Sequence, residues 1–173
     1  MTTELWQLSA IELAGRIVRH ETTARAATES VLARIAVANP LVNALTSVTP
    51  EKALQAADAA DAAQASGKSL GVLHGVPVTI KVNIDVQGEA TTDAVTAFKD
   101  HIASSDSPLV QSMREAGAII VGRTNAPAFS LRWFTDNSCY GRTLNPFDAN
   151  VTPGGSSGGA AAATAMGMGA IAH

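Results

Sequence analysis

The sequence has one cysteine, Cys139, among its 173 residues. A single thiol cannot form an intrachain disulfide, so the disulfide framework of small secreted domains is excluded and a cytoplasmic location is predicted. The first residues lack a basic segment followed by an apolar run, and no secretory signal is predicted. No stretch approaches the ~20 apolar residues that cross a bilayer, so a membrane is not an expected partner.

Clusters of basic residues are also absent. The formal net charge is −3 and the calculated pI is about 5.7. A nucleic-acid partner is not expected, because such proteins usually carry a basic face that neutralises phosphates. Hydrophobic residues make up 46% of the chain and charged residues 16%. This balance predicts a folded globular chain rather than a disordered one.

Paired histidines are missing as well. The four histidines are scattered, and no two have the spacing that places both on one helical face. No metal and no other cofactor is expected. A Ser-His-Asp triad is poorly supported within this segment, because no histidine accompanies the serines discussed below.

Helical and strand patterns alternate along the chain. An apolar run flanked by helices suits a parallel sheet covered on both faces. The sequence therefore predicts the α/β class, with helices over residues 9–20, from 22 or 23 to about 39, 50–65, 107–117 and 160–166, and strands over 44–48, 75–82 and 118–122. The second helix is expected to end before Pro40, because proline disfavours helix at the residue before it.

The last residues, 169–173, follow an alanine-rich helix with no predicted closing element. An interrupted sheet would expose an edge there. We therefore expect residues 1–173 to be the N-terminal part of a single, truncated domain.

The most informative motif is Gly-Gly-Ser-Ser-Gly-Gly at residues 154–159. A flexible linker fits poorly, because the motif adjoins an apolar helix. A Walker loop is excluded, because no lysine follows the motif. A glycine-rich turn that exposes a catalytic serine remains. A second pattern, Gly167-Met168-Gly169, follows a helix rather than a strand, so a dinucleotide site is discounted.

Lys81 closes an otherwise apolar predicted strand. A lysine in this place commonly extends its ammonium to solvent. If it is buried instead, desolvation lowers its pKa and yields a neutral amine that can act as a base. The sequence alone leaves both interpretations open.

Several motifs occur together in one order, and this combination resembles the amidase-signature family. They are Leu-His-Gly-Val-Pro-Val-Thr-Ile-Lys at residues 73–81, Ala-Gly-Ala-Ile-Ile-Val-Gly-Arg-Thr-Asn at 116–125, Asn-Pro-Phe-Asp at 145–148 and Pro-Gly-Gly-Ser-Ser-Gly-Gly at 153–159. The resemblance implies an α/β/α layered fold around a mixed, largely parallel sheet, with a Ser–cis-Ser–Lys triad. It covers nearly the whole chain.

Carried over by motif, the resemblance implies that Lys81 is the catalytic lysine and Ser156 the cis-serine that relays a proton. Ser157 would support their hydrogen bonds, and Ser130 would line the substrate site. The family nucleophile sits in a later Gly-Gly-Ser segment, but no serine follows Ser157 in this chain. Val82 replaces a common family aspartate, and Ala160 a common serine.

The implied function is hydrolysis of the C–N bond of a linear, small-molecule amide. The A subunit of a tRNA-dependent amidotransferase shares the same motifs, and an inactive truncated chain is a further alternative. The segment alone is expected to lack amidase activity. A homodimer is left open, and the substrate is not specified by the sequence.

Overall fold

The computed structural model describes residues 3–173. Helices and strands alternate along the chain, as the sequence predicts, and short 3-10 turns lie at Leu5–Gln7, Thr96–Phe98 and Ala128–Ser130. The elements are α1 (Ala10–Val18), α2 (Ala24–Val42), β1 (Leu45–Val48), α3 (Pro50–Ala65), β2 (Pro77–Lys81), α4 (Pro108–Glu115), β3 (Ile119–Thr124), α5 (Gly158–Ala165) and β4 (Ile171–Ala172).

The strands form one mixed sheet in the order β1-β3-β2-β4. β2 runs parallel to β3 and to β4, whereas β1 is antiparallel to β3. The register pairs Lys81 with Thr124, so β2 and β3 end at the same edge of the sheet. Side chains after parallel strands meet at this carboxyl edge, where α/β proteins usually bind ligands.

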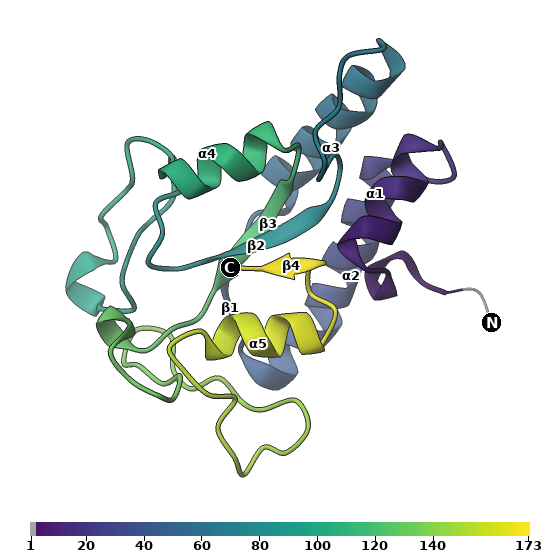
Figure 1. The fold of residues 1–173 in the computed structure, drawn as a ribbon. Coiled ribbons are helices and arrows are strands. Elements are labelled where there is room, and N and C mark those ends of the chain that lie inside the picture. The colour runs from purple at the N-terminus through teal and green to yellow at the C-terminus, as the bar shows by residue number, and fades with distance from the viewer. Residues whose placement is uncertain (1–2) are drawn as a thin grey trace.

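Helices cover both faces of the sheet, which confirms the predicted α/β/α layering (Figure 1). Alternate residues of β3 face opposite sides. Val121 packs in a cluster with residues of α2, α3 and α5, while Ile120 packs with Val110 of α4 and with residues of α1. Every residue of β2 and β3 is buried, which explains their continuous apolar pattern.

Local capping explains where several helices begin. Ser9 and Glu12 form a capping box at α1, and Ser107 caps α4 through the Val110 amide. Pro50 occupies the first turn of α3, where its missing N–H costs nothing.

The predicted end of α2 was wrong. The helix continues through Pro40 to Val42 and ends at Asn43, whose left-handed conformation (φ 50°) caps it. The Asn43 amide still donates to the Asn39 carbonyl at 2.8 Å, so the last turn closes despite the proline. Within residues 3–173, no helix is both long enough and apolar enough to span a membrane.

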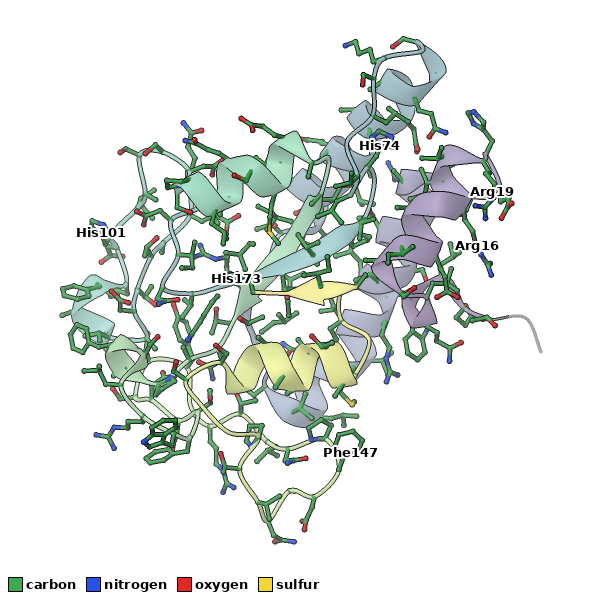
Figure 2. The ribbon with its side chains drawn as sticks, viewed as in Figure 1. Arg16, Arg19, His74, His101, Phe147 and His173 are labelled. Atoms are coloured by element: carbon green, nitrogen blue, oxygen red, sulfur yellow. The ribbon has the colours of Figure 1, made fainter. Side chains whose placement is uncertain are left out.

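The final residues also differ from the expectation of no closing element. Ile171–Ala172 pair with Val78 and Thr79 of β2 as the short strand β4. Figure 2 places His173 beside this part of the sheet, and its amide donates to the Thr79 carbonyl at 3.0 Å.

Candidate active site

Lys81 lies at the carboxyl end of β2 and is only 7% exposed. The interpretation in which its ammonium reaches bulk water is therefore wrong. Its Nζ donates to Ser156 Oγ at 2.8 Å and to Ser157 Oγ at 3.1 Å. Burial lowers the pKa of Lys81 from its ordinary value, because desolvation penalises the ammonium form.

The Gly-Gly-Ser-Ser-Gly-Gly motif forms the turn that leads into α5. The Gly155–Ser156 peptide bond is cis. Ser156 is half-buried and Ser157 is exposed, although both hydroxyls reach Lys81. A side chain at Gly159 would overlap the Asn125 backbone, whose carbonyl accepts from the Gly159 amide at 3.2 Å. Glycine is therefore required there for close packing rather than for flexibility.

Thr135 fixes the two ends of this turn, and sequence reasoning missed it. Its buried hydroxyl donates to the Gly154 carbonyl at 3.0 Å and accepts from the Gly158 amide at 3.1 Å. The signal was hidden, because Thr135 lies in an irregular segment with no periodicity. A threonine clamp of this kind becomes visible only once the chain is folded.

Ser130 lies across from the serine turn in a shared cavity. Its backbone has φ 56°, Phe129 before it has φ 52°, and its buried Oγ has no hydrogen-bond partner among the described residues. Such conformations in non-glycine residues concentrate at functional sites. The cavity has a volume of about 380 Å³ and is lined by Ser130, Leu131, Arg132, Trp133, Gly155 and Ser156.

Arg123 is a further residue whose importance the sequence did not reveal. It lies on β3, is 1% exposed, and donates to the carbonyl oxygen of Lys81 at 3.2 Å. An arginine inside the motif Ile-Ile-Val-Gly-Arg-Thr was the available signal, because a charged residue in a buried strand needs partners.

The histidines do not gather at this site. Figure 2 shows His74, His101 and His173 in separate parts of the molecule. Across residues 3–173, no cluster of three His, Cys, Asp or Glu side chains has a geometry that could hold a metal ion.

The arrangement suits proton transfer. A buried amine with a lowered pKa can accept a proton from a hydroxyl at hydrogen-bond distance. Ser156 lies between Lys81 and the cavity, so its hydroxyl can pass a proton in either direction. The structure brings Lys81, Ser156 and Ser157 together as one hydrogen-bonded group, and Ser130 lines the same cavity as Ser156.

Comparisons with known proteins agree on one family. The family model described as Amidase matches residues 26–173. An indoleacetamide hydrolase of Bradyrhizobium diazoefficiens is 48% identical over 169 residues, covering 98% of this chain and 32% of that protein. The A subunit of the glutamyl-tRNA(Gln) amidotransferase of Thermobifida fusca is 42% identical over 163 residues, covering 94% and 33%.

Solved structures share the fold. A fatty acid amide hydrolase aligns with a TM-score of 0.93 at 27% identity, covering 99% of this chain and 31% of that one. A bacterial aryl acylamidase of the amidase-signature family aligns with a TM-score of 0.90 at 31% identity, covering 94% and 34%. The chain thus spans about a third of the length of the relatives it matches.

Proposed function

Because this chain belongs to the amidase family, we propose that it supplies the lysine and relay serine of an enzyme that hydrolyses the C–N bond of a linear amide. The observation that carries the proposal is the 2.8 Å contact between Lys81 Nζ and Ser156 Oγ in a site where the lysine is buried.

In this proposal, neutral Lys81 takes a proton through the Ser156 hydroxyl while a nucleophilic serine attacks the amide carbonyl. The same pair then returns the proton to the departing nitrogen, which leaves as a neutral amine. Water then cleaves the acyl-serine ester, which releases the carboxylic acid and restores the serine hydroxyl. Ser157 holds the Lys81 amine in line through its 3.1 Å contact. The family resemblance gives the nucleophile to a later Gly-Gly-Ser segment, and residues 158–173 contain no serine.

We assign the 380 Å³ cavity beside Ser156 to the substrate. Its rim includes Trp133, which is 89% exposed, and Leu131, which is 80% exposed. Large apolar side chains bordering a polar reaction centre suit an amide that carries an aromatic or other apolar group. The indoleacetamide hydrolase relative is consistent with this substrate class.

A chimera tests the proposal. In it, residues 1–173 replace the matching segment of the Bradyrhizobium diazoefficiens indoleacetamide hydrolase. Hydrolysis of indole-3-acetamide that Lys81→Ala removes would support the proposal. A folded chimera with no hydrolysis of any simple aryl or alkyl amide would contradict it.

A second candidate is the A subunit of a glutamine-dependent amidotransferase, favoured by the 42% identity to the Thermobifida fusca protein. The two candidates differ in the substrate from which ammonia is released. An amidotransferase component would hydrolyse glutamine within a complex of several chains. An amidase would cleave the aromatic amide without any other chain. Measuring ammonia release from glutamine and from indole-3-acetamide separates them.

A further inference from the structure

The largest fully buried side chain of the described residues is that of Arg123, at 1% exposure. Burial of a guanidinium is unfavourable unless its N–H groups find acceptors. Burial does lower the pKa of Arg123, and the nearby Glu89 carboxylate opposes that change. The neighbours of Arg123 on β3 are small or apolar. The acceptors that stabilise its buried guanidinium must therefore come from other parts of the chain.

The contacts of Arg123 converge on the chain that follows Lys81. Its Nη2 donates to the Lys81 carbonyl at 3.2 Å and to the Ile84 carbonyl. Its Nη1 donates to Glu89 Oε2 at 3.3 Å and to the Ala90 carbonyl at 3.4 Å. One side chain thus ties together three carbonyl groups of the segment that leaves β2.

The backbone of Lys81 is one of the groups held by this arrangement. Its carbonyl accepts from Arg123 and also from the Ile84 amide at 3.0 Å, which closes a tight turn. The next amide, that of Val82, donates to the Thr124 carbonyl at 3.0 Å. The anchored carbonyl fixes the backbone at Lys81, and so the point from which its side chain extends to Ser156 and Ser157.

We propose that Arg123 is a positioning residue for Lys81: it holds the lysine backbone so that the amine stays buried against Ser156. The positioning of Lys81 is a structural inference, and only its consequence for catalysis rests on the proposed function. Glu89 balances the buried guanidinium, and its side chain is only 12% exposed. The planar fork of arginine suits several acceptors at once, which a lysine in its place could not match.

The test reads the surroundings of Lys81 in the 173-residue chain itself. An amine-reactive ester is applied over a pH series, and modification of each lysine is measured by peptide mass spectrometry, with exposed Lys68 as internal reference. The main variant is Arg123→Met with Glu89→Gln, which removes both charges together. The local net charge is thereby unchanged. A shift in the pH dependence of Lys81 labelling then reflects a changed position of Lys81 and not the loss of a nearby cation.

The matched control is Arg25→Met with Glu29→Gln on α2. It makes the same chemical change at an exposed ion pair, where the two groups lie 2.7 Å apart. Arg123→Lys is the second variant, because it keeps a cation opposite Glu89 but loses the guanidinium fork. Circular dichroism establishes that each variant is folded.

If Arg123 positions Lys81, the labelling midpoint of Lys81 moves up by about one pH unit in the Arg123/Glu89 variant, because the amine becomes hydrated. Arg123→Lys gives a smaller shift in the same direction, and the Arg25/Glu29 control gives none. Unchanged labelling of Lys81 in folded Arg123 variants overturns the proposal. Should the double variant fail to fold, Arg123→Lys decides in the same way.

The outcome is separable from that of the proposed function. Activity of the chimera that survives Lys81→Ala would remove the catalytic role of Lys81, whatever the labelling shows. Unchanged labelling with Lys81-dependent activity would remove the role of Arg123 and leave the proposed function standing.

Discussion

Lys81 Nζ lies 2.8 Å from Ser156 Oγ, although 75 positions of sequence separate the two residues. The contact forms because β2 ends at the carboxyl edge of the sheet and the turn before α5 passes over that edge. Neither residue alone distinguishes a catalytic site from a solvent-exposed lysine or a serine in a surface loop. Their juxtaposition, with the lysine buried, places an amine of lowered pKa within hydrogen-bond distance of a hydroxyl.

The two serines of the turn should differ in importance. In the chimera, Ser156→Ala is expected to lower kcat by roughly 10²–10⁴-fold, the range of general acid–base contributions. Ser157→Ala should cost much less, because the Ser157 hydroxyl is farther from Nζ and its side chain is exposed. Steady-state kinetics at one pH compares them. Equal losses would argue against a specific relay through Ser156.

Activity should rise with pH through the pKa of Lys81, because only the neutral amine accepts a proton. Burial lowers that pKa, so the rise should lie below the ordinary lysine value of about 10.4. On the acid side, kcat/KM should fall about tenfold per pH unit. A pH–rate profile of the chimera measures this limb. Its midpoint at or above the ordinary lysine value would contradict a buried base.

Thr135 should stabilise the serine turn. Thr135→Val removes a hydroxyl that satisfies the Gly154 carbonyl and the Gly158 amide, and should cost about 1–3 kcal/mol of unfolding free energy. Thr135→Ser keeps the hydroxyl and should recover most of this loss. Urea denaturation of the chain measures both, with Thr164→Val at an exposed site of α5 as control. A loss no larger than that of the control would refute the clamp.

Trp133 should select apolar substrates. Trp133→Ala is expected to raise KM for indole-3-acetamide several-fold while changing KM for acetamide little, because only the larger substrate reaches the apolar rim. Phe147→Ala is the matched control, since Phe147 is 87% exposed and outside the cavity lining. Equal changes in KM for both substrates would contradict selection by the apolar rim.

Much of this fold was predictable because local signals agree with the tertiary structure. Ser9 and Pro50 mark helix starts through capping and through the missing N–H of proline, and the structure keeps both. Pro40 misled the prediction, because Asn43 and neighbouring packing outweigh the local cost of proline. Burial of Val42 and Ala38 in the core supports those last turns.

Only the site residues that lie within a family motif could be predicted from the sequence. Lys81 and Ser156 lie in recognisable stretches, so their proximity could be anticipated from the family resemblance. Arg123 and Thr135 act through contacts with backbone groups far along the chain. No local pattern encodes such contacts, because they depend on how strands and loops meet after folding.

The most direct test of this account is the rate of indole-3-acetamide hydrolysis by the chimera with and without Lys81→Ala, at matched folding and protein concentration. The account predicts that the alanine variant keeps its circular dichroism spectrum and loses at least about 100-fold in kcat. A variant that folds normally and turns over at the unsubstituted rate would contradict the base role of Lys81.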